Sequence, residues 1–290
     1  MTLSGKIIPL LKSKGGHKMG AQDLSIFSLG ILFVFLLPIL YISRHLKFGI
    51  NKPIIFSMGR MCLQLGFVGL YLEFLFKLDS PWLNGVYLMM MISIACYSIL
   101  KSSRLKIVLF FKPLFLALLI PFAIILLFFN GVVVHIDNLF EAKYLIPIGG
   151  MLLGNSLRSI IIGLTNFYSG LQKNEKEYLY SLSLFNNRIQ ALKPWFRESI
   201  VAAITPTLAS MATIGLVSLP GMMTGQILGG SIPIVAIKYQ IAIMVCIFYT
   251  EYFSVILSIL FSLKMGFNDL DVLNTNIFAK TNLHNQGKKF

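Results

Sequence analysis

The sequence predicts an all-α protein that crosses a membrane about seven times. Of its 290 residues, 56% are hydrophobic and only 12% are charged, whereas soluble domains carry about 25% charged residues. The apolar residues gather in seven runs, most of them long enough for a helix to cross the hydrocarbon core, and most Lys and Arg lie between the runs. We therefore expect a multi-pass protein of the cell membrane, the inner membrane of a bacterium, surrounded by lipid. The formal net charge of +14 then sets topology, and no nucleic-acid partner is expected.

The apolar runs define the membrane domain. In chain order they lie at 24–43, 61–76, 82–100, 108–129, 144–168, 199–229 and 234–262. The first run is long enough to span and no small-residue cleavage site follows it, so we interpret it as a span and not as a signal peptide. The membrane domain then covers 24–262. It follows a basic N-terminal segment, 1–23, and precedes a polar tail, 263–290, which we expect to be partly disordered.

The connections between the runs differ in charge. Three of them, 44–60, 101–112 and 170–197, hold most of the Lys and Arg, whereas the alternate ones hold only Lys77 and Lys143. By the positive-inside rule the basic connections and the C-terminus are cytoplasmic, and the N-terminus lies outside.

The connection 170–197 is too long for a tight turn and is rich in helix formers. Its apolar residues recur at helical spacing, which predicts a basic amphipathic helix at the cytoplasmic surface, closed by Pro194 and Trp195 at the membrane edge. Such a helix lies on lipid or docks into a groove of a partner protein.

The stretch from Gly215 to Gly225 combines three glycines, a proline, a serine and a threonine with apolar residues. A broken helix in hydrocarbon is stable only beside protein or a wet cavity, so the break marks a substrate path or hinge, or else a packing face for another helix. We favour the hinge, because this sixth run directly follows the connection 170–197. The candidate path residues are Asn155, Gly215, Ser218, Pro220, Gly221, Met222, Met223, Gly225 and Gln240. Asn155 and Gln240 equally suit hydrogen bonding between helices.

Two charged residues lie deep in apolar runs: Arg158 in the fifth and Glu251 in the seventh. Charges at this depth are costly and usually face the bundle interior, paired or in water. We predict that the two face each other, either as a bridge that fixes packing or as a gate.

Nothing in the sequence predicts enzymatic chemistry. No phosphate-binding loop, nucleophile elbow or zinc-protease signature occurs, and the four His are scattered. Cys62, Cys96 and Cys246 have no paired spacing, and Met222 and Met223 suit gap filling better than metal binding. We expect no catalytic residue, no metal site and no cofactor bound by this chain.

Several blocks of the second half resemble a known family. These are Ile146-Pro-Ile-Gly-Gly150, Gly215-Leu-Val-Ser-Leu-Pro-Gly-Met-Met223 and Ile237-Lys-Tyr-Gln240. They are similar to the FetB (YbbM) family of ABC-transporter permeases, which includes plant aluminium-tolerance relatives. The resemblance extends over roughly 24–262 and is weaker in the first half.

This resemblance implies a permease that forms a homodimer, binds two separate cytoplasmic ATPase subunits that carry the ATP, and exports iron or another metal. The implied coupling residues are Tyr180, Leu182, Ser183, Leu184, Phe185, Asn186 and Arg188. Phe185 and Asn186 replace a Gly-Ala pair of the family pattern, and Tyr180 replaces a Glu. Two alternatives stay open: an ATP-independent secondary transporter or channel, and a membrane scaffold that docks a cytoplasmic partner.

Overall fold

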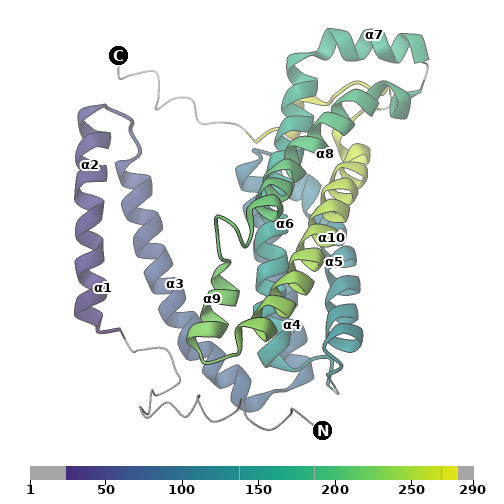
Figure 1. Cartoon of the computed structure of the whole chain (residues 1–290). Helices are drawn as coiled ribbons and strands as arrows, with labels where there is room; N and C mark the ends of the chain where they lie inside the picture. The colour runs from purple at the N-terminus through teal and green to yellow at the C-terminus, as the bar shows by residue number, and fades with distance from the viewer. Residues whose placement is uncertain (1–23, 137, 186, 269, 280–290) are drawn as a thin grey trace, which may run out of the picture. The chain divides into compact units, whose positions relative to one another are not determined.

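A computed structural model describes residues 24–136, 138–185, 187–268 and 270–279 (Figure 1). The N-terminal segment 1–23, the end of the tail at 280–290 and the coupling residue Asn186 lie outside the described residues. The described chain forms two compact units, which are treated separately. The smaller unit holds residues 24–57 and 219–240, and the larger unit holds 58–218 and 241–279.

The smaller unit begins with one nearly continuous apolar helix. It is built from α1 (Ile26–Leu32), a 3-10 turn (Phe33–Phe35) and α2 (Leu36–His45). A tight turn then leads into α3 (Asn51–Leu78), and the Asn51 side-chain amide donates to the Leu40 carbonyl at 3.1 Å, which ties α3 to α2. The short helix α9 (Gly221–Leu228) and the start of α10 (Pro233–Gly266) also belong to this unit.

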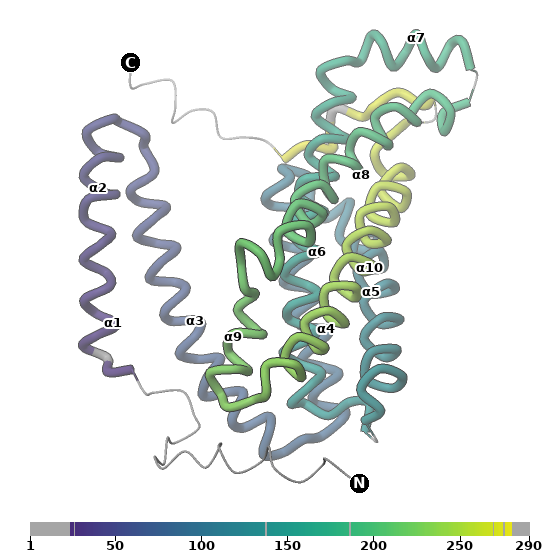
Figure 2. Tube along the Cα trace, in the orientation of Figure 1, coloured from purple at the N-terminus to yellow at the C-terminus, as the bar shows by residue number. Residues whose placement is uncertain are grey.

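The larger unit is a helix bundle around one central helix. Its elements are α4 (Pro81–Ser102), α5 (Ile107–Phe128) with a π-helical turn (Phe129–Val133), α6 (Ala142–Lys173), α7 (Glu175–Phe185), α8 (Arg188–Thr213), the ends of α3 and α10, and a 3-10 turn (Thr275–Ile277). Helix α6 packs most extensively against α8 and α4 (Figure 2). Its residues Leu145, Ile160 and Phe167 are fully buried, so α6 supplies the centre of the core.

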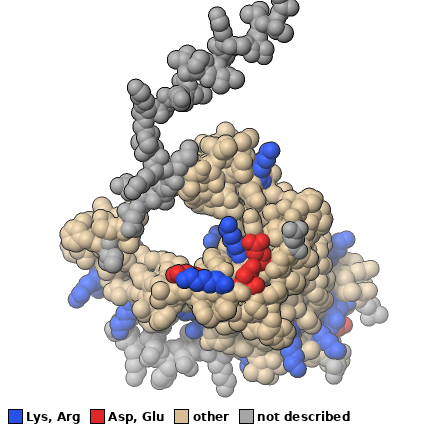
Figure 3. All heavy atoms as spheres, turned by 90° about the horizontal axis from the view of Figure 1, so that it is seen from below, with Lys and Arg blue, Asp and Glu red and all other residues tan. Residues whose placement is uncertain are grey.

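Apolar surface confirms a multi-pass membrane protein. Within the described residues, six helical segments are long and apolar enough to cross a membrane, and large side chains such as Phe27, Phe67 and Trp82 are more than 70% exposed. Lipid can cover exposed apolar side chains of this kind at little cost, whereas water cannot. Figure 3 views the molecule from below, where acidic and basic residues are scattered among more numerous uncharged ones.

The remaining expected span, 199–229, is not one helix. Helix α8 ends at Thr213, residues 214–220 are not helical, and α9 resumes at Gly221. The seven expected spans are therefore six continuous helical segments and one broken span.

Buried polar groups hold the connection between α5 and α6 against α4. The Asp79 carboxylate accepts from the Ala142 backbone N–H at 2.8 Å and from the Asn84 amide at 3.2 Å, and Asn84 also donates to the Phe140 carbonyl at 2.8 Å. Asn84 is fully buried. Because hydrocarbon cannot hydrogen-bond to the start of α6, the carboxylate satisfies that N–H and fixes this end of the bundle.

The bundle depends on the absence of a side chain at Gly163 of α6. A Cβ there would lie 2.9 Å from Val255 Cγ1 on α10 and 3.6 Å from Ala203 Cβ on α8. A Gly163→Leu substitution must therefore separate α6 from α10. Overpacking of this kind costs about 1–3 kcal/mol or more, which corresponds to a melting temperature lower by roughly 3–10 °C.

Thermal unfolding of the purified protein in detergent measures this loss. The matched control is Gly154→Leu on the same helix, where an added Cβ meets nothing within 4 Å. Equal melting temperatures for the two variants would contradict the close approach of α6 and α10.

Candidate functional site

A seam of small and hydroxyl-bearing side chains runs where α6, α8 and α10 meet. We call it the polar seam. It consists of Ser156, Ser159 and Gly163 on α6, Ser199, Ala203 and Thr207 on α8, and Thr250, Glu251, Ser254, Ser258 and Ser262 on α10. On α10 the four hydroxyls recur every four residues, which places them along one face of the helix. Apart from Thr207, which is half-buried, the whole seam is buried.

Glu251 is the only acidic residue of the polar seam. Its side chain is 1% exposed. The hydroxyls of Thr207 and Ser159 interact with its carboxyl, and the charge of Arg158 acts on it. Its Oε2 atom still has no hydrogen-bond partner among the described residues, and the same holds for the hydroxyl oxygens of three seam serines: Ser156, Ser254 and Ser258. Buried oxygens without protein partners can instead bind water in a solvated path, or a cation that passes along it.

Arg158 and Glu251, which were predicted to face each other, do not form an ion pair within 4.0 Å in the described structure. Arg158 is exposed while Glu251 is buried. Within the part of the chain that is described, ion pairs within 4.0 Å join only Lys77 to Glu73 and Arg188 to Asp271. The two charges interact over a longer distance, and a gating or packing role for them stays a prediction.

Tyr168 closes one end of the polar seam. Its hydroxyl donates to Ser262 Oγ at 2.7 Å, and Ser262 donates in turn to the Ile259 carbonyl at 2.7 Å. The rings of Phe110 and Phe167 pack edge-on against it. This end is therefore hydrogen-bonded and filled, in contrast to the unpartnered oxygens nearer Glu251.

The break after α8 is a tight, partly hydrogen-bonded turn. Gly215 has a φ of +84°, which side chains disfavour, and its N–H donates to the Ser218 carbonyl at 2.9 Å. Leu216 and Val217 are 88% and 83% exposed at its tip. Pro220 then immediately precedes α9, and its ring fixes the φ angle of the residue from which the helix starts.

The structure divides the candidate path residues between the two units. Asn155, Gly215 and Ser218 belong to the larger unit, whereas Pro220, Gly221, Met222, Met223, Gly225 and Gln240 belong to the smaller. The Asn155 amide donates to the Met151 carbonyl on its own helix at 2.8 Å. Gln240 is buried, and its Oε1 has no hydrogen-bond partner within the described ranges. Their role as a path or hinge stays a prediction.

Helix α7 is fixed to its neighbours through one tyrosine. The Tyr178 hydroxyl donates to the Asp271 carbonyl at 2.6 Å, and its ring packs against Trp195 of α8 and Phe267. Burial raises the pKa of the Tyr178 phenol to about 12, so it remains a donor at neutral pH. Arg188 Nη1 also donates to Asp271 Oδ1 at 2.8 Å. The start of α8 and the segment after α10 therefore clamp the base of α7.

Helix α7 and the start of α8 also expose apolar side chains. Tyr180, Leu184 and Phe185 are 66%, 63% and 54% exposed, and Ile189 at the start of α8 is 72% exposed. Of the other expected coupling residues, Leu182 is half-buried, Ser183 donates to the Tyr180 carbonyl, and Arg188 faces Asp271. We call Tyr180, Leu184, Phe185 and Ile189 the apolar tip.

The expected single amphipathic helix in 170–197 is corrected by the structure. The segment contains the end of α6, all of α7 and the start of α8. The chain turns at Asn187, whose side chain accepts from the Ile189 N–H at 2.9 Å and caps α8. Pro194 and Trp195 do not end a helix, because α8 continues through them to Thr213.

The tail is more ordered than its composition predicts. Helix α10 runs to Gly266, and the described residues 267–279 pack back onto the bundle. The Lys106 N–H donates to the Ile277 carbonyl and the Ala279 N–H to the Arg104 carbonyl, both at 2.8 Å. The available signal was a set of spaced apolar residues, of which Phe267, Leu273 and Ile277 are buried.

No cluster of three or more His, Cys, Asp or Glu that could hold a metal ion occurs in the described ranges. The oxygens of the polar seam are instead spread along three helices, an arrangement that suits successive transient contacts with a ligand.

Comparison with known proteins places the chain in a family. The model of the uncharacterised protein family UPF0014 matches residues 26–267. The chain is 34% identical to the UPF0014 membrane protein YjkA of Bacillus subtilis, covering 75% of this chain and 85% of that protein. It is 30% identical to a protein of Escherichia coli named as the probable iron export permease protein FetB, covering 86% and 95%.

A plant relative, the protein ALUMINUM SENSITIVE 3 of Arabidopsis thaliana, is 31% identical over 74% of this chain and 76% of its own length. No solved structure is significantly similar. With a family match that spans the bundle, the broken span and α10, this chain belongs to the UPF0014 family of membrane proteins.

Proposed function

We propose that this chain is the permease subunit of an ATP-driven transporter that exports iron or another metal, and that it works as a homodimer with a separate cytoplasmic ATPase. The observation that carries the proposal is the apolar tip on α7. A short helix that exposes Tyr180, Leu184 and Phe185 beyond the bundle, yet is clamped at its base by Tyr178, suits a rigid docking element. The positive-inside rule assigns this end of the bundle to the cytoplasm, where an ATPase is available.

The chain offers a direct connection from this docking element to the membrane interior. Helix α8 starts beside α7, contributes Ser199, Ala203 and Thr207 to the polar seam, and ends at the turn of Gly215. Movement of α7 would be transmitted along α8, because a helix is stiff along its axis. The turn at 214–220 would then absorb the motion.

The substrate class follows from the chemistry of the polar seam and from the name of the E. coli relative. Hydroxyl and carboxylate oxygens suit hard cations better than soft ones. A single carboxylate with scattered hydroxyls also suits weak, transient binding, which transport requires.

Replacing the apolar tip with charges tests the docking. The double variant Leu184→Asp with Phe185→Asp removes two exposed anchors, and the few hot-spot residues of an interface contribute about 2 kcal/mol or more each. We expect the affinity for the ATPase to fall about tenfold or more, with loss of ATPase stimulation. Co-purification and ATP hydrolysis measure the two effects.

The control for docking is Lys176→Gln, an exposed polar position on the same helix. If the double variant does not affect ATPase binding, the docking proposal is contradicted. The chain is then better explained as an ATP-independent transporter or a scaffold.

The turn at Gly215 is tested by Gly215→Ala. A Cβ at a φ of +84° costs about 1–2 kcal/mol, which biases the turn away from its present conformation. We expect slower transport with unchanged ATPase binding. The control is Gly154→Ala inside α6, outside the candidate path, where an added Cβ meets nothing within 4 Å. Equal transport by both variants would return the break to a packing role.

The polar seam is tested by Glu251→Gln, which keeps the shape and removes the charge. We expect several-fold slower ATP-dependent Fe²⁺ transport in proteoliposomes, because a carboxylate is the strongest ligand for a hard cation in the seam. The control Glu73→Gln alters an exposed carboxylate on α3. Transport that needs Glu251 and a proton gradient but no ATP would favour a secondary transporter instead.

A further inference from the structure

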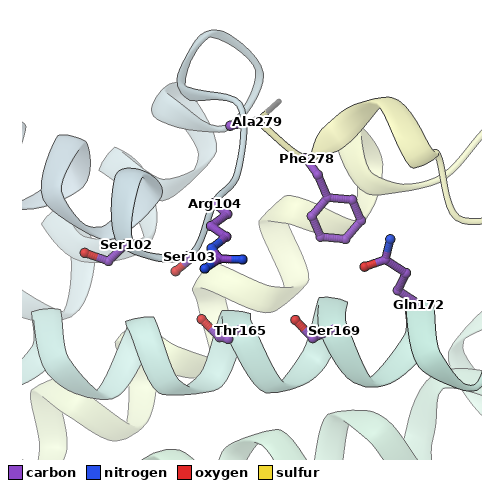
Figure 4. Close-up of a pocket in the computed structure, with 8 residues that line it drawn as sticks. All are labelled: Ser102, Ser103, Arg104, Thr165, Ser169, Gln172, Phe278 and Ala279. Atoms are coloured by element: carbon purple, nitrogen blue, oxygen red, sulfur yellow. The ribbon is translucent and has the colours of Figure 1, made fainter. Parts of the chain in front are cut away.

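A polar cavity lies outside the polar seam, at the end of the larger unit that carries α7. It has a volume of about 420 Å³ (Figure 4). Three parts of the chain enclose it: the end of α4 with its connection to α5, the last turns of α6, and the end of the described tail. The lining residues are Ser102, Ser103, Arg104, Thr165, Ser169, Gln172, Phe278 and Ala279.

Apart from Phe278 and Ala279, the lining residues carry hydrogen-bond donors, and one of them is a cation. Four hydroxyls, one amide and the Arg104 guanidinium line the cavity, and none of the lining residues is acidic. In Figure 4 the guanidinium points toward α6 and lies between Ser103 and Thr165. Neither of the two ion pairs found within the described residues involves Arg104. Its charge is therefore not neutralised by a carboxylate within 4.0 Å in the described chain.

Ser103 adds an independent observation. The residue is only 6% exposed, and its hydroxyl oxygen has no hydrogen-bond partner in the described part of the chain. A buried hydroxyl without a partner costs free energy, and most buried hydroxyls in proteins have one. Ser103 is also one of the residues that line the cavity, next to Arg104 in the chain.

The backbone at Arg104 has an unusual conformation. Its φ is +56°, a left-handed conformation that a side chain other than Gly or Asn rarely adopts. The tail holds this conformation, because the Ala279 N–H donates to the Arg104 carbonyl at 2.8 Å. The tail thus forms one wall of the cavity and also fixes the residue that supplies its charge.

We propose that this cavity binds a phosphate group. Guanidinium and hydroxyl donors without a carboxylate match the oxygens of a phosphate in geometry and charge. The volume exceeds that of inorganic phosphate, so it also admits the start of an ester, and the cavity lies where the spans α4 and α6 end. Free phosphate and the headgroup of an anionic phospholipid share this chemistry.

A bound phosphate would join α4, α6 and the tail. The tail also holds α7 through Asp271, which accepts hydrogen bonds from Tyr178 and Arg188. Occupancy of the cavity would therefore stiffen the base of the apolar tip. The phosphate would act as a regulator or structural ligand, whatever the transported substrate is.

The binding test uses the purified full chain in detergent and two probes. Radiolabelled inorganic phosphate is titrated directly, and the protein is separately reconstituted into phosphatidylcholine nanodiscs with or without phosphatidic acid. We expect at least one probe to bind and to raise the melting temperature. Phosphate binding in detergent identifies the free anion as a ligand, whereas stabilisation only by phosphatidic acid identifies the lipid headgroup.

Substitutions assign the binding to this cavity. Arg104→Gln should weaken it about tenfold or more, because hydrogen bonds to a charged partner are strong. Ser103→Ala keeps the charge of Arg104 and should weaken binding less than Arg104→Gln does. A graded loss of this kind distinguishes a damaged binding site from a misfolded protein. Lys101→Gln, a nearby cation that does not line the cavity, should bind as the unaltered protein does. Binding of neither probe, or equal binding by Arg104→Gln and Lys101→Gln, would overturn the proposal.

Discussion

The close approach of α6, α8 and α10 at Gly163 is the constraint on which the larger unit depends. With no side chain at this position, Val255 and Ala203 fill the space that a Cβ would need. In lipid there is no hydrophobic force between helices, so association relies on van der Waals contact and on polar groups that small residues allow to meet. The same small residues bring Ser159, Thr207 and Glu251 together. Packing and polarity in this bundle thus have one cause, and a change that widens the interface also disperses the polar seam.

The polar seam differs along its length. Toward α7, Tyr168 and Ser262 satisfy each other and aromatic rings fill the space around them. Nearer Glu251, oxygens lack protein partners. Buried polar groups without a partner are costly and rare in proteins, so each of them needs an explanation. We interpret the asymmetry as a path that is closed at one end and can bind a cation at depth.

Much of the fold could be predicted because lipid imposes strict rules on the sequence. Apolar runs located the membrane-spanning helices to within a few residues at most ends, and Gly215 and Pro220 located the break. Three features were not predictable in this way. The turn at Asn187 depends on a cap, which interrupts a helix without changing hydrophobic periodicity. The tail is ordered by three spaced apolar residues among polar ones. The exposure of Arg158 depends on the rotation of α6, which spacing along a single helix does not determine.

The tail holds the end of the larger unit that carries α7. Asp271 offers its backbone carbonyl to Tyr178 and its carboxylate to Arg188, so one residue holds both α7 and the start of α8. A few residues later the tail pairs with the connection between α4 and α5. The base of α7 is therefore attached to α4, α8 and α10 together. A docking helix supported by three helices cannot tilt alone, so any force applied at the apolar tip must either move the bundle as a body or be absorbed at the non-helical residues 214–220. Gly215, at the start of that turn, has the least restricted backbone. Motion that does not move the bundle as a body would therefore change the backbone conformation at this break.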